Sequence, residues 1–150
     1  MSIYLHKSHN VSVLLYHLVC VAKYRNPIFN KQADNTLKTI CLEVEKKYEI
    51  KFLEIGTDKD HVHFLIQSVP IYSPTKIART VKSITARELK LRMPELKREL
   101  WGAAVWTSGF FINTVGKTGS ENVIKQYIQN QGNDHKSQYN VIHKNQLSLI

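Results

Sequence analysis

The sequence predicts an α+β fold in which helices cover one antiparallel β-sheet. Four apolar segments rich in β-branched residues alternate with two amphipathic segments in the order β-α-β-β-α-β. A short polar turn separates the second and third strand segments, which favours a hairpin. A further helical segment follows the fourth strand, so the complete order is β-α-β-β-α-β-α.

The first strand and the first helix are predicted from a change in hydrophobic period. Residues 11–21 are dense in β-branched and aromatic side chains, as is typical of a buried strand. A basic loop from Lys23 to Pro27 ends this strand. Residues 31–48 then place apolar side chains at helical spacing, and these are Leu37, Ile40, Cys41, Val44 and Tyr48.

The hairpin and the second helix follow. Residues 50–55 predict the second strand, residues 56–60 a turn, and residues 61–69 the third strand. Ser73 before Pro74 is a good helix start, and this helix should reach about Arg92, before Pro94. Its expected inner face consists of Ile77, Val81, Ile84 and Leu91. Residues 95–100 predict a short extra turn.

The last third of the chain predicts one more strand and one more helix. Residues 105–115 carry the fourth strand, centred on residues 110–112. Residues 118–121 match the pattern of a capping box and predict the start of the last helix. The order matches a ferredoxin-like or RRM-like split βαβ sheet with an added C-terminal helix. We expect one domain over residues 1–132 and a polar tail over residues 133–150.

Composition limits the classes of partner. The 150 residues carry a net charge of +9 with a pI near 9.6, which favours a nucleic-acid partner. Cys20 and Cys41 both lie in apolar runs, which indicates buried thiols in a reducing cytoplasm. No apolar run is long enough to span a membrane, and no signal peptide is visible.

His61 and His63 are the first chemical feature of the chain. Residues two apart on a strand point to the same face, so both imidazoles can bind one metal ion. Such a pair also arises by chance on strands. Asp60 can hold one of the imidazoles in a fixed tautomer, or it can serve only as a turn residue.

Tyr127 and Gln131 are the second chemical feature. They lie one turn apart in the last predicted helix and share a face. A phenol is a possible nucleophile and an amide oxygen a possible third metal ligand, although a tyrosine beside Val123, Ile124 and Ile128 also fits a core position. The mixed nitrogen and oxygen set suits Mn²⁺ or Mg²⁺. A metal beside a tyrosine in a basic protein indicates phosphodiester chemistry on nucleic acid.

Other chemistries have no support in the sequence. There is no P-loop, no GxGxxG motif and no CxxC pair. We therefore expect no nucleotide cofactor, since a tyrosyl-DNA bond stores the energy of the phosphodiester that it replaces.

Four short segments, in this order, resemble one known family. They are residues 16–19 with 23–25, residues 58–63, residues 106–108 with 114–116, and residues 126–131. Together they resemble the single-tyrosine transposases of the HUH (His-hydrophobe-His) nuclease superfamily. These are the TnpA proteins of insertion sequences that move as single-stranded DNA. Cys20 stands where this family often has an aromatic residue, and Lys117 where it often has a second glycine.

The resemblance implies a function and a set of roles. His61, His63 and Gln131 would be metal ligands, and Tyr127 the nucleophile that forms a 5′-phosphotyrosine on single-stranded DNA. It also implies hairpin recognition at the element ends, a homodimer with a shared sheet and composite active sites, and a location in the prokaryotic cytoplasm, at the nucleoid when bound to DNA. Gly116 and Gly119 would let the tyrosine helix swing, or they simply make a turn.

Four basic residues are candidates for phosphate contacts, and these are Lys23, Arg25, Arg79 and Lys82. Each is equally compatible with an ordinary solvated charge. Three alternatives to the transposase remain open: a domesticated relative that acts on chromosomal palindromes, a non-catalytic single-stranded nucleic-acid-binding module, and a nuclease that activates water.

Overall fold

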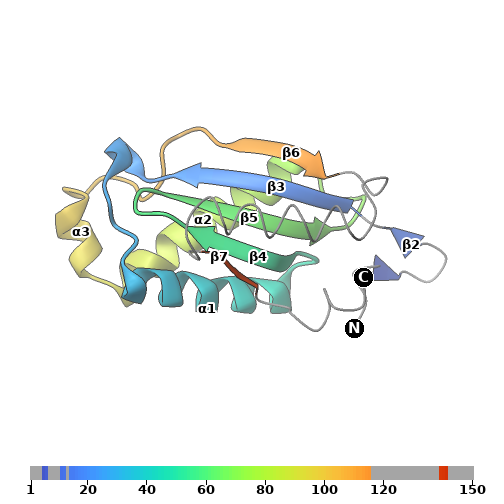
Figure 1. The fold of residues 1–150 in the computed structure, drawn as a ribbon, viewed down its shortest axis with the longest axis horizontal. Coiled ribbons are helices and arrows are strands. Elements are labelled where there is room, and N and C mark those ends of the chain that lie inside the picture. Colours follow the sequence, from blue (N-terminus) through green and yellow to red (C-terminus); the bar gives the residue numbers. More distant parts are fainter. Residues whose placement is uncertain (1–4, 7–10, 13, 116–138, 142–150) are drawn as a thin grey trace.

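The computed structural model describes residues 5–6, 11–12, 14–115 and 139–141, and side chains within residues 14–115. Figure 1 shows its arrangement. The elements in chain order are β1 (Leu5–His6), β2 (Val11–Ser12), β3 (Leu14–Val21), the 3₁₀ turn η1 (Lys23–Arg25), α1 (Lys31–Lys47), β4 (Lys51–Thr57), β5 (His61–Ser68), α2 (Pro74–Arg92), α3 (Glu95–Glu99), β6 (Phe111–Val115) and β7 (Tyr139–Val141).

The main sheet has the order β6-β3-β5-β4-β7, with every pair antiparallel. Its first four strands follow the ferredoxin-like order, which confirms the predicted fold class. The two central strands are β3 and β5, as expected, and β7 adds a strand outside β4. A separate two-stranded sheet pairs β1 with β2.

Alternation along the central strands separates the two faces of the sheet. Tyr16 and Leu18 on β3, and Phe64 and Ile66 on β5, belong to the buried core. The same core includes the inner residues of both long helices, so α1 and α2 cover this face. The opposite face carries the odd-numbered residues of β3 and β5.

Both long helices begin at side-chain caps, of which Ser73 is predicted from the sequence. The Asn30 side chain accepts a hydrogen bond from Ala33 N at 2.8 Å, and the Ser73 hydroxyl accepts one from Lys76 N at 3.0 Å. Each cap satisfies a backbone donor that the first turn of a helix leaves without an internal partner.

Three predicted details differ from the structure. The central strand begins at Leu14 and not at residue 11, because Leu14 pairs with Ser68, the last residue of β5. The strand predicted over residues 105–115 covers only Phe111–Val115 in the structure. Val105 and Trp106 are apolar because they belong to the buried core, not because they lie in this strand. Leu91, predicted on the inner face of α2, is 66% exposed. The buried residues of α2 recur at every fourth position and end at Leu89, so Leu91 lies on another side of the helix. The buried row at this spacing consists of Ile77, Val81, Thr85 and Leu89.

The predicted tyrosine helix lies outside the described residues, as do Tyr127, Gln131, Gly116, Gly119 and Lys117. The division of the chain at residue 132 therefore stays a prediction. None of the helices in the described part of the chain is both long enough and apolar enough to span a bilayer.

A buried carboxyl group lies on the face of the sheet opposite the helices. Glu54 pairs with Leu65 across β4 and β5 and is only 4% exposed. Burial raises its pKa to about 8. The folded protein therefore holds this proton more tightly than the unfolded chain does.

This pKa difference predicts how stability depends on pH. The contribution of Glu54 is fully present below its ordinary pKa of 4.5 and is lost as the pH rises through about 8. Since one pKa unit corresponds to about 1.4 kcal/mol, the rise from 4.5 to about 8 means that ionising Glu54 should cost on the order of 5 kcal/mol. The free energy of unfolding, measured with urea, should therefore fall less in Glu54→Gln than in the wild type between about pH 5 and about pH 9. Parallel pH profiles for the two proteins would contradict this assignment.

Candidate metal centre and nucleic-acid surfaces

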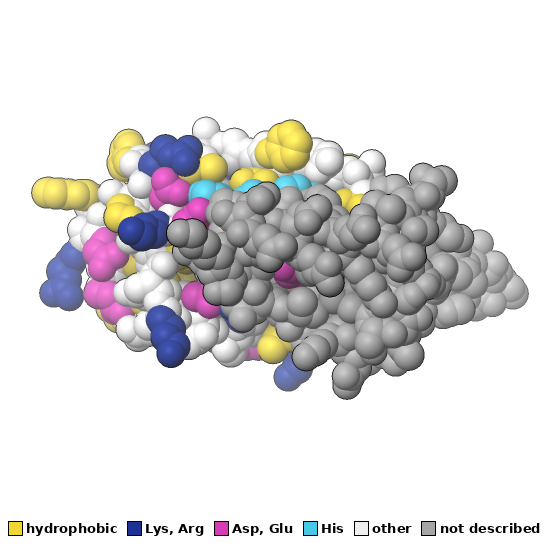
Figure 2. All heavy atoms as spheres, in the orientation of Figure 1, with side chains coloured by type: hydrophobic (Ala, Val, Ile, Leu, Met, Phe, Trp, Pro, Cys, Tyr) yellow, Lys and Arg dark blue, Asp and Glu magenta, His cyan; other side chains and the backbone are white. Residues whose placement is uncertain are grey.

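Three histidines meet on the sheet face opposite the helices. His61 and His63 lie on β5 beside β3, opposite Val21 and Val19. Their ring centres are 5.0 Å apart. His17 on β3 completes the group, with its ring centre 5.1 Å from that of His63. Figure 2 shows the histidines at the surface, with acidic and basic side chains gathered at one end of the row.

The turn before β5 orients His61. The Nδ1 atom of His61 lies 2.8 Å from an Asp60 carboxylate oxygen, and its Nε2 atom lies 3.8 Å from Asp58. Arg25 donates from Nε to the other Asp60 oxygen at 3.1 Å. The hydrogen bond with His61, helped by Arg25, lowers the pKa of Asp60. An ionised Asp60 accepts the Nδ1 proton, which leaves the lone pair of the His61 ring on Nε2, the atom that a metal ion would need.

The side chain of His17 orients His63. His17 Nε2 lies 2.8 Å from His63 Nδ1, and the edge of Phe111 packs against the His17 ring. Burial lowers the pKa of His17, so its neutral form is favoured. A neutral His17 can accept the Nδ1 proton of His63. In that tautomer Nε2 of His63 carries the lone pair that a metal needs.

The described residues fit a divalent metal site that needs further ligands. They supply two neighbouring imidazoles whose Nδ1 atoms are both held, as is usual for histidines that bind metal. No group of three or more His, Cys, Asp or Glu that could hold an ion occurs within the described part of the chain. The predicted third ligand, Gln131, lies outside it.

His17 is the residue that sequence reasoning missed. It lies 46 residues from His63, and only the register of β3 against β5 brings them together. A signal was present in the sequence, because His17 is a polar residue within an apolar strand and shares its strand face with Val19 and Val21. A polar ring on the outward face of a central strand is a candidate neighbour of a metal pair on the adjacent strand.

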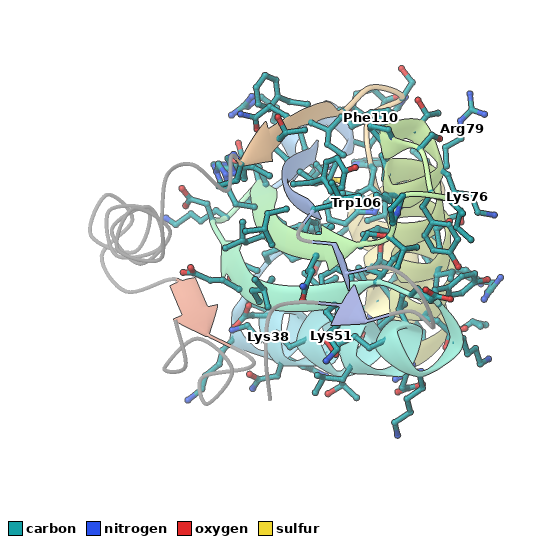
Figure 3. The ribbon with its side chains drawn as sticks, turned by 90° about the vertical axis from the view of Figure 1, so that its right-hand side faces the viewer. Lys38, Lys51, Lys76, Arg79, Trp106 and Phe110 are labelled. Atoms are coloured by element: carbon teal, nitrogen blue, oxygen red, sulfur yellow. The ribbon has the colours of Figure 1, made fainter. Side chains whose placement is uncertain are left out.

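A basic groove lies along α2, apart from the histidines. It has a volume of about 840 Å³. One wall is α2 with Lys76, Arg79 and Lys82, and the other is the segment from Ala104 to Phe110. Figure 3 shows Lys76, Arg79, Trp106 and Phe110 near this groove, and Lys38 and Lys51 on another side of the molecule. Several hydroxyl side chains also line it, and these are Ser73, Thr75, Thr80, Ser83, Thr107 and Ser108.

The four predicted phosphate contacts fall on two separate surfaces. Lys23 and Arg25 lie in η1, near the turn that holds His61, whereas Arg79 and Lys82 line the groove. The Lys82 ammonium donates to the carbonyls of Thr107 at 2.8 Å and Gly109 at 2.9 Å. It therefore fastens the loop before β6 to α2, and burial lowers its pKa.

Comparison of sequences places the chain among known proteins. The family described as "Transposase IS200 like" matches residues 10–131. The ISDra2 transposase TnpA of Deinococcus radiodurans is 30% identical over 121 residues, which cover 79% of this chain and 84% of that protein. The transposase of insertion sequence element IS200 from Salmonella typhimurium is 26% identical over 121 residues, covering 81% and 78%.

Comparison of structures agrees with this result. A crystal structure of a Deinococcus radiodurans R1 protein, provisionally assigned as a transposase, superposes with a TM-score of 0.68 and 26% identity, covering 85% of this chain and 97% of that one. A REP-associated tyrosine transposase bound to a REP hairpin has a TM-score of 0.53 and 13% identity, covering 89% and 74%. The second likeness concerns the fold alone.

The contact between His17 and His63 predicts an effect on metal affinity. Replacing His17 with Phe keeps a ring in place but removes the acceptor, so Mn²⁺ binding should weaken by about 10- to 100-fold. His17→Gln retains an acceptor and should recover part of the affinity. Titration calorimetry with Mn²⁺ on the protein without DNA measures both. Wild-type Mn²⁺ affinity in His17→Phe would show that His17 has only a packing role.

Proposed function

This chain belongs to the IS200-like transposase family, and we propose that it cleaves and rejoins single-stranded ends of an insertion sequence through a phosphotyrosine at Tyr127. Membership makes the protein a transposase, an enzyme of DNA transposition. The nucleophile, the metal ligands and the DNA structure that it recognises are the parts that we propose.

The observation that carries this proposal is the pair of oriented imidazoles on the open face of the sheet. His61 and His63 lie side by side, and each Nδ1 atom is held by a different neighbour. Such an arrangement supports two Nε2 ligands for one Mg²⁺ or Mn²⁺ ion. Gln131 would add an oxygen ligand. When bound, the ion neutralises phosphate charge and aligns the phosphorus for in-line attack.

The chain supplies the nucleophile, and the DNA supplies the leaving group. The phenol oxygen of Tyr127 attacks the phosphorus, and the bond to the 3′ oxygen of the preceding nucleotide breaks. The products are a 5′-phosphotyrosine and a free 3′-hydroxyl. In the second step another 3′-hydroxyl attacks the phosphotyrosine, which restores a phosphodiester and the phenol. Both steps exchange one phosphate ester for another, so no nucleotide cofactor is required.

The basic groove is the surface that we assign to hairpin DNA. Lys76 and Arg79 can pair with phosphates, while the surrounding hydroxyls offer hydrogen bonds to the backbone and sugars. The REP-associated transposase is bound to a hairpin in its own structure. A groove that reads shape and backbone suits an imperfect hairpin with a few unpaired bases.

We also assign a homodimer with composite sites, in which the tyrosine of one chain serves the histidines of its partner. Among the described strands, β6 and β7 are the two outer strands of the main sheet, and each has a neighbour on one side only. A strand edge offers backbone donors and acceptors to a second copy.

Covalent capture tests the proposed nucleophile. The protein is mixed with Mn²⁺ and end-labelled single-stranded hairpin DNA from the flanks of the gene, then separated on a denaturing gel. We expect a protein–DNA adduct in the wild type and none in Tyr127→Phe, since the phenol oxygen is the attacking atom. His61→Ala and His63→Ala should also abolish the adduct but keep hairpin binding.

The same gel distinguishes the alternatives. Cleavage without an adduct, equal in the wild type and Tyr127→Phe, would indicate a nuclease that activates water. Random subunit exchange in an equimolar mixture of Tyr127→Phe and His63→Ala makes half of the dimers mixed, with one active site in two. If the sites are composite, about a quarter of the wild-type adduct should therefore return, on the His63→Ala chain. No regained adduct after subunit exchange would place the tyrosine and the histidines of a site on one chain.

Loss of two groove cations tests the hairpin surface. Lys76→Ala combined with Arg79→Ala should weaken hairpin binding and lower the salt slope of log Kd by about one for each lost phosphate contact. The matched control is Lys46→Ala combined with Lys47→Ala, which removes two exposed charges from α1. Fluorescence anisotropy across a salt series measures both. An equal loss of hairpin affinity in the control would show that the groove contributes only through the general charge of the protein.

A further inference from the structure

Two aromatic side chains are exposed at the end of the molecule next to His61. Tyr24 in η1 is 71% exposed, and Trp101 after α3 is 89% exposed. Single exposed apolar residues are common, but tryptophan gains more than most residues from burial. The other tryptophan of the chain, Trp106, is 4% exposed.

Hydrogen bonds hold the two aromatic turns beside each other. The Asn26 side chain donates to the Glu99 carbonyl at 3.3 Å, and Lys23 N donates to the Val105 carbonyl at 2.8 Å. The turn after β3 and helix α3 accordingly lie at the same end of the molecule (Figure 1). The aromatic residues therefore stand on neighbouring turns of one surface.

Backbone conformation marks the same turns. Tyr24, Arg25 and Trp101 have φ values of 58°, 52° and 55°, and they are the non-glycine residues with positive φ in the described part of the chain. This left-handed region disfavours side chains with a Cβ atom and is often retained at functional sites. Tyr24 and Trp101 bury little apolar surface at these positions, so the hydrophobic effect gives folding little in return.

The charge around the aromatic pair is mainly positive. Lys23 places its ammonium 5.5 Å from the centre of the Tyr24 ring, and Lys97 and Arg98 are exposed in α3. The exposed acid among them is Glu99. Arg25 contacts Asp60, which in turn holds His61. Arg25 and Asp60 thus connect this surface to His61, a proposed metal ligand.

We propose that Tyr24 and Trp101 form a stacking platform for unpaired bases of the DNA strand that leads to the scissile phosphate. Lys23 and Arg98 would hold the phosphates of this strand. Aromatic faces combined with basic side chains are the usual means of binding single-stranded DNA without reading its sequence. The platform rests on the proposed function, because it serves the same single strand that Tyr127 attacks.

The tryptophans provide a local readout of the platform. Trp101 is exposed and Trp106 is buried, so a stacked base should quench mainly Trp101. We expect an unstructured oligothymidine to quench the fluorescence saturably. An abasic oligonucleotide of equal length keeps the phosphates but should not quench. Equal quenching by both would overturn the proposal, since it would report charge and not stacking.

Substitutions separate stacking from turn structure. Tyr24→Ala and Trp101→Ala should each weaken oligothymidine binding by about 5- to 100-fold, whereas Tyr24→Phe and Trp101→Phe should keep most of the affinity. Leu91→Ala, another exposed apolar residue, is the control and should bind like the wild type. Unchanged affinity in both alanine variants would refute the platform. The platform would also be refuted if Trp101→Ala lost the dimer on sedimentation but kept its DNA affinity. Trp101 would then contact a second copy of the chain and not DNA.

The two proposals can fail separately. If the Tyr127 adduct forms but the alanine variants bind oligothymidine normally, the platform is wrong and the proposed function stands. If base-dependent quenching occurs but no adduct forms on any flank DNA, the platform is supported as a single-strand site and the proposed catalytic function fails.

Discussion

The register between β3 and β5 is the constraint on which the rest of the structure depends. Pairing Val19 with His63 sends Leu18 and Phe64 into the core and displays the histidines on the open face. A slip of one residue would exchange these faces and bury the imidazoles among apolar side chains. Stability and site geometry are therefore specified by the same set of backbone hydrogen bonds.

The polar turn before β5 gives this register a defined end. Its Asp60 carbonyl accepts from Ala22 N at 2.8 Å, and its Asp60 side chain joins Arg25 to His61. A single residue thus closes the backbone ladder, orients an imidazole and positions a basic loop. Substitutions at Asp60 would consequently combine effects on folding, metal binding and DNA binding that single readouts cannot separate.

Local pattern was enough to predict most of the fold. β-Branched and aromatic content together with a polar turn predicted the central strands, and Ser73 is a helix cap as predicted. The sequence could not predict contacts that depend on strand pairing over long distances in the chain, such as the contact of His17 with His63. An apolar residue can indicate a strand or a buried loop. Val105 and Trp106 were predicted in a strand but are buried residues of the loop before β6. The role of Lys82 depends on carbonyls 25 and 27 residues away.

The fastening of the loop by Lys82 has an evolutionary consequence. This loop forms a wall of the basic groove and continues directly into β6, where Asn113 pairs with His17. If the groove binds DNA as proposed, substitutions that adapt it to a new DNA structure also act on the strand that supports the histidine face. We expect relatives that diverge in DNA preference to change loop residues in concert with β6. Selection would act on recognition and cleavage as one inherited unit.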